Sequence, residues 1–151
     1  MENVTVKRHP NAQLILDYLD DVNQYLKAVE NGTAPAGGYK NKYLADDIVA
    51  QYQGRNDLAG RHGGEAFYKK YVPRLSAYKS TLVEVIDVLA SDHRGAAIVK
   101  ERMESSDGRS VEFVRVAIYL IADGRIKEMW SLDEDQYAMD EFLMAGRNPA
   151  G

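Results

Sequence analysis

The sequence VEFVRVAIYLIADGRIKEMWSL, residues 111–132, decides the fold that we expect for this chain. Residues typical of strands fill both ends of the stretch, and Asp123-Gly124 interrupts it. Because Asp-Gly supplies the backbone angles of a tight hairpin turn, the pattern predicts two long antiparallel strands. A second turn signal, Asp107-Gly108, predicts that residues 96–104 form another strand of the same meander, and residues 135–144 predict a closing helix.

Upstream of this meander the sequence has helical periodicity. Residues 12–30 place apolar side chains three and four positions apart, with Asn11 as the expected N-cap. A short strand over residues 47–53 and a short helix over about 64–71 precede the strand expected at residues 80–90. Helices that come first and antiparallel strands that come later predict an α+β fold, in which the helices pack on one face of a bent sheet.

Composition limits the classes of protein to which the chain can belong. Its 151 residues fit one domain, with an ordered core expected over residues 11–144. The net charge of -4 gives no general attraction to nucleic acid or to an anionic membrane, and no apolar run approaches the length of a membrane span. The chain has no cysteine, which excludes disulfides and fits a reducing, cytoplasmic location. Its three scattered histidines predict no metal site, and residues 60–64 lack the ending of a phosphate-binding loop, so no cofactor is expected.

Three stretches resemble one known group of proteins. Residues 48–68 (IVAQYQGRNDLAGRHGGEAFY) resemble the strand, loop, glycine and helix segment of ketosteroid isomerase-like proteins. Residues 123–142 (DGRIKEMWSLDEDQYAMDEF) resemble the closing strand of SnoaL-like proteins, and the end of the first helix, YLKAVENG, fits the same pattern. The chain thus resembles the ketosteroid isomerase and SnoaL-like (nuclear transport factor two-like) superfamily. The resemblance implies a cystatin-like α+β barrel, in which a cone-shaped curved antiparallel sheet packs against N-terminal helices around a pocket.

The isomerase residues carry over only in part. The resemblance places Tyr25 at the oxyanion-binding tyrosine, Gln51 at the catalytic base and Val116 at the second acid. Glutamine cannot abstract a proton and valine cannot donate one, so the usual ketosteroid isomerase arrangement is not expected. Gln51 could instead orient a substrate carbonyl, and Tyr25 could equally be an ordinary residue of the apolar helix face.

The SnoaL-like cyclases imply a different base. Theirs is an aspartate on the last strand, and Asp133, three residues after Trp130, is the matching position. With a two-residue turn at Asp123-Gly124, strand alternation directs Asp133 into the pocket, where burial would disfavour its charged form and suit it to acid/base work. The cross-strand pairs expected inside the pocket are Met129 with Ile118, Ser131 with Val116, and Asp133 with Val114. The alternative is that Asp133 caps the following helix.

Further candidates depend on strand direction. Glu101 faces the pocket if Val99 and Met103 do, whereas a one-residue change of register would turn it to solvent. His62 is a candidate because histidine as a residue type suits acid/base work, although its surroundings are equally typical of an exposed turn. The tyrosines expected around the pocket are Tyr18, Tyr52, Tyr68 and Tyr71. The apolar residues expected on the outer face, where the resemblance implies a homodimer interface, are Phe113, Ala117, Tyr119, Trp130 and Leu132.

These observations leave more than one function open. The first is a cofactor-independent cyclase, isomerase or dehydratase (a lyase) that acts on a hydrophobic polyketide-like or steroid-like molecule, with Asp133 as acid/base and Tyr25 as a donor to the oxyanion. The second is a non-catalytic small-molecule-binding or dimerisation domain, which the identities of Gln51 and Val116 favour. An epoxide hydrolase is a weaker third hypothesis, because it needs an Asp-Arg-Asp cluster that the sequence does not display. Residues 33–38 (TAPAGG) lack apolar anchors and could form a lid.

Overall fold

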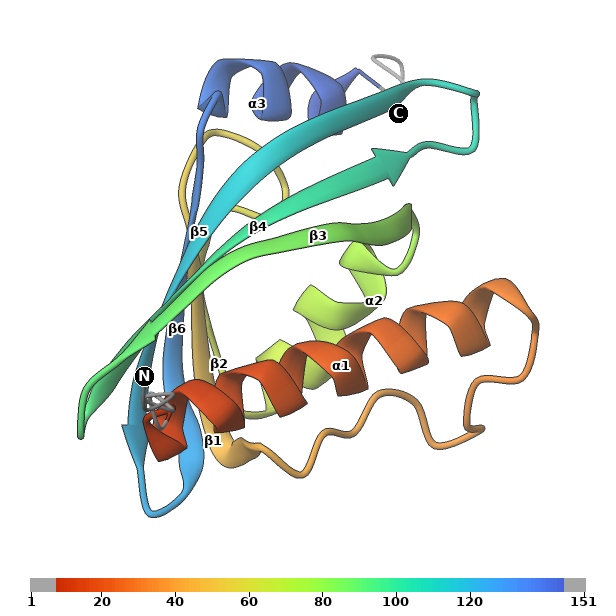
Figure 1. Cartoon of the computed structure of the whole chain (residues 1–151). Helices are drawn as coiled ribbons and strands as arrows, with labels where there is room; N and C mark the ends of the chain where they lie inside the picture. The colour runs from red at the N-terminus through yellow and green to blue at the C-terminus, as the bar shows by residue number, and fades with distance from the viewer. Residues whose placement is uncertain (1–7, 146–151) are drawn as a thin grey trace, which may run out of the picture.

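In the computed structural model, which describes residues 8–145, a long helix crosses the concave face of a curved six-stranded sheet (Figure 1). The helices are α1 (Pro10–Glu30), α2 (Val72–Leu75) and α3 (Gln136–Met144), and a π-helical turn, η1 (Phe67–Tyr71), leads directly into α2. The strands are β1 (Leu44–Tyr52), β2 (Gly60–Gly63), β3 (Lys79–Ala90), β4 (Arg94–Glu104), β5 (Ser110–Ala122) and β6 (Arg125–Asp133). This is the α+β fold with a bent sheet that the sequence predicts.

The sheet has the strand order β2-β1-β6-β5-β4-β3. Strands β3 to β6 form the expected antiparallel meander. One neighbouring pair departs from the antiparallel pattern, because β1 lies parallel to β6. The pair is parallel because the chain leaves β1 through β2, the short helices and the whole meander before β6 returns beside it. The core fills the concave side, where α1 packs against β3 and β4.

The first helix starts slightly earlier than the sequence predicts. His9 is the N-cap, and its Nδ1 accepts a hydrogen bond of 3.0 Å from the backbone N–H of Asn11. Pro10 favours this start, since its fixed φ suits the first helical position and its missing N–H is not needed there. Asn11, which we expected as the cap, instead donates to the carbonyl oxygens of Ser91 and Asp92 at 2.9 and 3.0 Å and ties the helix to the β3–β4 turn. Within residues 8–145, no helix has the length and apolar character that a membrane span requires.

A bulge in the last hairpin decides which side chains face the core. Next to the turn, Ala122 pairs with Arg125 and Ile121 with Ile126, as a two-residue turn requires, but the next pair is Leu120 with Glu128. The extra residue on β6, Lys127, displaces every later pair by one position. The observed pairs are Tyr119 with Met129, Ala117 with Ser131, and Arg115 with Asp133. The expected pairing with Ile118, Val116 and Val114 is therefore wrong, because a one-residue slip exchanges the two faces of a strand.

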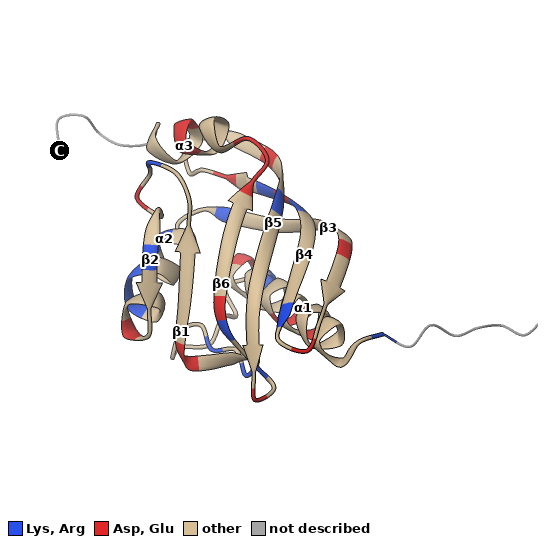
Figure 2. Cartoon of the chain, turned by 90° about the vertical axis from the view of Figure 1, so that its left-hand side faces the viewer, with Lys and Arg blue, Asp and Glu red and all other residues tan. Residues whose placement is uncertain are grey.

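The two faces of the sheet differ in character as a result. Phe113, Ala117 and Tyr119 are buried on the concave face, which corrects their expected outward orientation. The convex face is turned to the viewer in Figure 2, where the centre of β5 and β6 carries few charged residues. The half-buried apolar side chains on this face are Ile98, Val114, Val116, Ile118, Leu120 and Trp130, and Leu132 beside them is exposed.

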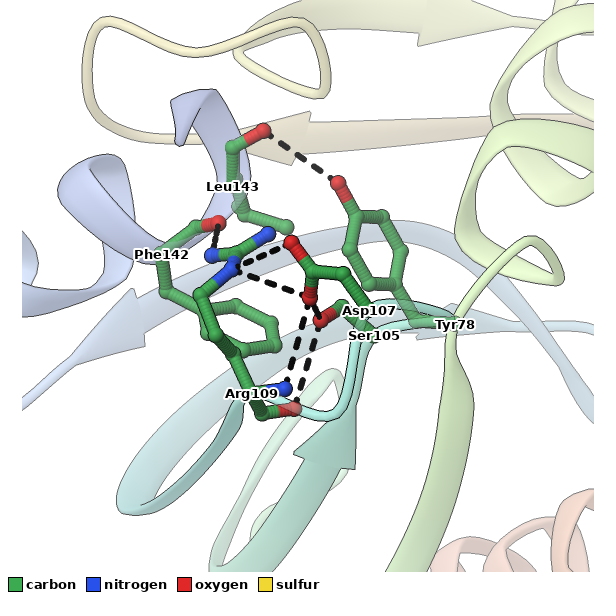
Figure 3. Close-up of polar contacts among 6 residues, drawn as sticks. All are labelled: Tyr78, Ser105, Asp107, Arg109, Phe142 and Leu143. Carbon is green, nitrogen blue, oxygen red and sulfur yellow. Dashed lines mark hydrogen bonds and ion pairs between the residues drawn. The ribbon is translucent and has the colours of Figure 1, made fainter. Parts of the chain in front are cut away.

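The C-terminal helix is clamped by the β4–β5 turn (Figure 3). The guanidinium of Arg109 donates from Nη1 to the carbonyl oxygen of Phe142 at 2.8 Å and lies 5.2 Å from the centre of that ring. Asp107 holds the guanidinium by accepting from its Nε at 2.8 Å, and the hydroxyl of Ser105 donates to Asp107. A cation thus meets a carbonyl of the last helical turn, where a helix carries partial negative charge.

Candidate active site

A partly open pocket of about 140 Å³, here called the inner cavity, lies between the concave face of the sheet and the elements α1, η1 and α2. Its wall combines apolar side chains with several tyrosines and two charged residues. The polar or large residues that matter below are Tyr18 and Tyr25 from α1, Tyr39, Tyr71 from η1, Glu101 from β4, Arg115 and Tyr119 from β5, and Met129 and Ser131 from β6. Cavities of about 150 Å³ in other proteins accommodate one benzene ring, so this one fits a single small ring.

A wider hollow of about 740 Å³ lies outside this cavity. Tyr39 borders both spaces, and its ring packs edge-on against Tyr25 with 4.9 Å between the ring centres. The charged residues of the outer hollow, such as Lys40, Lys42 and Asp46, are exposed to solvent. The inner cavity is the better candidate site despite its smaller volume, because its charged groups are more buried than those of the outer hollow and water therefore screens them less.

The charged residues at the inner cavity form a chain across three strands. Arg115 donates from Nε to Oδ1 of Asp133 at 2.7 Å and from Nη2 to Oδ2 at 3.2 Å. Its Nη1 donates to Oε2 of Glu101 at 3.3 Å. The side chain of Asp133 is 0% exposed, that of Arg115 is 10% exposed and that of Glu101 is 23% exposed. Of the two acids, Glu101 is therefore the one that reaches the cavity.

Aromatic rings flank Arg115, the central residue of this ion-pair cluster. The guanidinium of Arg115 lies between the rings of Tyr52 and Phe113, 5.2 and 5.0 Å from their centres. The hydroxyl of Tyr52 donates to Oδ2 of Asp133, so Asp133 is held from two sides. The alternative role of Asp133 as a helix cap does not occur, because Asp135 caps α3 and accepts from the N–H of Ala138 at 3.0 Å.

Burial controls the protonation of these groups. Burial raises the pKa of Glu101, the guanidinium of Arg115 opposes this shift and the carboxylate of Asp133 adds to it. Burial by itself would lower the pKa of Arg115, but the charges of Glu101 and Asp133 hold that pKa well above its usual value. Glu101 is thus an acid that exchanges its proton closer to neutral pH than an exposed carboxyl does.

Three tyrosine hydroxyls complete the polar surface. The hydroxyl of Tyr18 donates to the sulfur of Met129 at 3.6 Å, and a thioether is a weak acceptor. The hydroxyls of Tyr71 and Tyr119 form no hydrogen bond with any residue of the described range 8–145. Burial raises the pKa of Tyr18, Tyr71 and Tyr119, so all three stay protonated and can donate to a ligand.

The comparison with protein families agrees with this architecture. A family model described as the SnoaL-like domain matches residues 22–129. The chain belongs to the SnoaL-like family. The matched stretch includes Tyr25, Glu101 and Arg115 and ends before Ser131 and Asp133.

Solved structures resemble this SnoaL-like protein in fold. TerC, crystallised with polyporic acid, has a TM-score of 0.70 at 16% identity and covers 91% of this chain and 100% of its own. A protein from Jannaschia sp. CCS1, provisionally named a SnoaL-like polyketide cyclase, has a TM-score of 0.68 at 12% identity over 95% of this chain and 100% of its own. A Xanthomonas campestris protein of unknown function with a cystatin-like fold has a TM-score of 0.59 at 20% identity over 83% and 97%. No curated protein matches the chain.

Part of the predicted site of this SnoaL-like protein comes together in the cavity. The predicted residues on its wall are Tyr18, Tyr25, Tyr71, Glu101, Met129 and Ser131. Glu101 faces inward because Val99 and Met103 are both buried, as strand alternation requires. Asp133 and Tyr52 lie behind Arg115, in contact with the cluster but not on the cavity wall.

Other predicted residues lie elsewhere. Val116 faces the convex side of the sheet, because β5 alternates regularly and its neighbours Arg115 and Ala117 are buried on the concave side. Gln51 also points outward, since its neighbours Ala50 and Tyr52 are buried on the concave side. In the orientation that its surroundings require, the amide oxygen of Gln51 accepts from Nε1 of Trp130 at 2.9 Å.

Two aromatic candidates stand beside the cavity. The ring of His62 stacks on Tyr71 with 4.9 Å between centres, and its Nε2 donates to the carbonyl oxygen of Leu58 at 2.8 Å. His62 therefore backs a cavity residue and is not on the wall itself. Tyr68 borders the outer hollow, because it lies one position from Phe67, whose side chain occupies the core.

The residue that sequence reasoning missed is Arg115. It stands alone among apolar residues in FVRVAI, and a charge in such a strand is costly unless it is paired. This cost indicated from the sequence that Arg115 needs an acidic partner. The expected register concealed it, because it placed Arg115 on the outer face.

Proposed function

We propose that this SnoaL-like protein is a cofactor-independent acid/base enzyme, an isomerase, cyclase or dehydratase, acting on a hydrophobic small molecule with a carbonyl or enol oxygen. The position of Glu101 carries the proposal. Its carboxyl borders a largely apolar cavity, and burial raises its pKa, which suits a group that both takes and gives a proton. The guanidinium of Arg115 stands 3.3 Å away, where it can stabilise negative charge on a substrate oxygen.

The roles divide by access to the cavity. Glu101 removes a proton from the carbon next to the carbonyl and returns it to another atom of the substrate. Arg115 and the hydroxyls of Tyr18 and Tyr119 donate to the enolate oxygen that forms. Tyr25 lines the same cavity and is a further candidate donor. Asp133 positions Arg115, a role that replaces its expected one as acid/base, because its side chain is 0% exposed and out of a substrate's reach.

The cavity volume constrains the substrate. About 140 Å³ suits a single ring, whereas a polyketide-like or steroid-like polycycle would need the walls to move apart. The contact between Tyr25 and Tyr39 borders the outer hollow, so its opening would join the two spaces. We therefore favour a compact substrate, or a larger one of which only one ring enters the cavity.

A second candidate function has its own supporting observation. An epoxide hydrolase needs two carboxyls bridged by an arginine, and Glu101, Arg115 and Asp133 have this arrangement. In that case Glu101 would activate a water molecule on the cavity side of the cluster. The alternative of a non-catalytic binding domain loses part of its basis, since Gln51 and Val116 lie outside the cavity and say nothing about its chemistry.

Two probe reactions separate these functions. Deuterium exchange from D₂O into cyclohexanone, followed by NMR, reports proton removal next to a carbonyl, and hydrolysis of cyclohexene oxide reports water activation. Glu101→Gln should lower the deuterium exchange rate by about a hundredfold or more. Glu112→Gln is the matched control, because Glu112 lies on the neighbouring strand and its side chain is 46% exposed. Epoxide hydrolysis without exchange favours the second function, and binding without either reaction favours a binding domain.

The assembly and location of the protein are also part of the proposal. The apolar convex face supports a homodimer formed across the sheet. The lack of cysteine supports a location in the reducing cytoplasm. Sedimentation equilibrium of the wild type and of Leu132→Glu tests the interface. A dimer that the substitution converts to a monomer supports it, and a monomeric wild type contradicts it.

A further inference from the structure

The inner cavity presents donors that lack strong acceptors. Tyr18 donates to a sulfur atom at 3.6 Å and also interacts with the hydroxyl of Tyr39. Within residues 8–145 the hydroxyls of Tyr71 and Tyr119 donate to no acceptor. The contact from Nη1 of Arg115 to Glu101, at 3.3 Å, is longer than the 2.7 Å bond from its Nε to Asp133. Oxygen atoms of a ligand would satisfy all these donors, and an anionic oxygen would do so best.

Charge sets a second condition on the ligand. Two carboxylates and one guanidinium leave the cluster with one net negative charge when both acids are ionised. An anion placed beside Arg115 would add a second negative charge in a buried site, unless one carboxyl takes up a proton.

The hydrogen bonds indicate which carboxyl that is. Asp133 accepts from two nitrogens of Arg115 and from the hydroxyl of Tyr52, and its side chain is 0% exposed, so no part of it is open to a ligand in the cavity. Glu101 accepts one contact of 3.3 Å and faces the cavity. The titratable groups that face Glu101 are Tyr18 from α1, Tyr71 from η1, Arg115 and Tyr119 from β5, and Asp133 from β6.

We propose that the cavity binds a single-ring organic acid as its carboxylate, enolate or phenolate anion, and that Glu101 takes up one proton from solvent as the anion binds. The proton binds to a carboxylate oxygen of Glu101, and Nη1 of Arg115 then donates to the anionic oxygen of the ligand and no longer to Glu101. The protonated carboxyl becomes one more donor to the ligand oxygen. This inference rests on the proposed function in that it places the reacting molecule in the same cavity.

Benzoate is the probe, because it stays ionised across the working pH range and its ring matches the cavity. Calorimetric titration of the wild type in phosphate and in Tris, two buffers with different ionisation enthalpies, measures the protons taken up on binding. We expect close to one proton per benzoate at pH values where Glu101 is ionised. The dissociation constant should then rise about tenfold per pH unit, as one linked proton requires. Benzamide, which is neutral and similar in shape, should bind much more weakly.

The variants assign the proton to one residue. Glu101→Gln keeps the shape of the side chain and cannot be charged, so it should bind benzoate without proton uptake and without the pH dependence. Glu112→Gln should behave as the wild type. The measurement on the wild type needs no variant and stands even if Glu101→Gln folds poorly.

Several outcomes would overturn the inference. These are a failure of the wild type to bind benzoate at acidic pH, equal affinity for benzamide, binding without proton uptake, and an unchanged pH dependence in Glu101→Gln. Deuterium exchange into cyclohexanone is scored separately on the same preparations. If deuterium exchange occurs but benzoate does not bind, the proposed function stands and this inference fails. If benzoate binds with proton uptake but no deuterium exchange occurs, this inference stands and the proposed function fails.

Discussion

Asp133→Asn should destabilise the protein by about 3 kcal/mol, because it removes the charge that anchors a buried guanidinium. Oδ1 of Asp133 accepts from Nε of Arg115 at 2.7 Å, and Oδ2 accepts from Nη2 at 3.2 Å and from the hydroxyl of Tyr52. Asparagine keeps one of these oxygens and turns an amide N–H₂ toward Nη2 or Nε, where two donors oppose each other. Glu101 remains 3.3 Å from Nη1 and leaves Arg115 partly paired, so we expect the lower end of the about 3–5 kcal/mol typical of a broken buried pair.

Urea unfolding followed by the fluorescence of Trp130, the single tryptophan, measures this change. A loss of about 3 kcal/mol corresponds to a fall in Tm of about 6–12 °C for a chain of this size. Glu134→Gln is the control, since Glu134 is the next residue and is exposed. If Asp133→Asn lost no more than about 0.5 kcal/mol, as a surface substitution does, the ion-pair cluster would not be the stabilising feature that we describe.

Further predictions concern pH, packing and the C-terminal helix. The raised pKa of Glu101 means that the folded protein keeps a proton which the unfolded chain releases, so the wild type should lose stability as pH rises from the ordinary carboxyl pKa through the folded one. In Glu101→Gln, urea unfolding across pH should lack this loss, and an equal loss would contradict the assignment. Gly95→Ala should cost about 1–3 kcal/mol because the new Cβ overlaps the buried side chain of Ile15, whereas Gly37→Ala, with open space around it, should change little. Arg109→Met should cost about 1 kcal/mol and speed amide hydrogen exchange in the last turn of α3, and unchanged exchange there would contradict the clamp.

Local features account for much of what the sequence predicts correctly. The two Asp-Gly turns lie where expected, and Asp123 adopts a φ of 54° while Gly124 adopts 70°, the conformation that this pair favours. The inward direction of Glu101 follows from the alternation of Val99 and Met103, which a regular strand imposes without reference to its partners. Each of these features depends on residues that are close together in the chain.

The site itself depends on an event that the sequence pattern did not reveal. One bulged residue, Lys127, reverses the alternation of β6 beyond the turn, so that Met129, Ser131 and Asp133 share the concave face with Tyr119, Ala117 and Arg115 and not with Ile118, Val116 and Val114. A bulge is decided by packing between strands, and the hydrophobic pattern of β5 tolerates either face because both are largely apolar. The prediction of Asp133 as the acid/base therefore found a residue of the cluster but assigned it the wrong neighbours.

The sequence by itself thus determined the order of elements, the hairpin turns, the apolar face of α1 and the family pattern, because nearest-neighbour sterics and periodicity act along the chain. Only the tertiary structure decided that Glu101, Arg115 and Asp133 meet, since they come from three different strands and their contacts need the exact register of two hairpins. The physical reason is that a buried charge is tolerated only where an oppositely charged residue lies beside it. Strand register decides which residues lie side by side, and the packing of the whole sheet fixes that register.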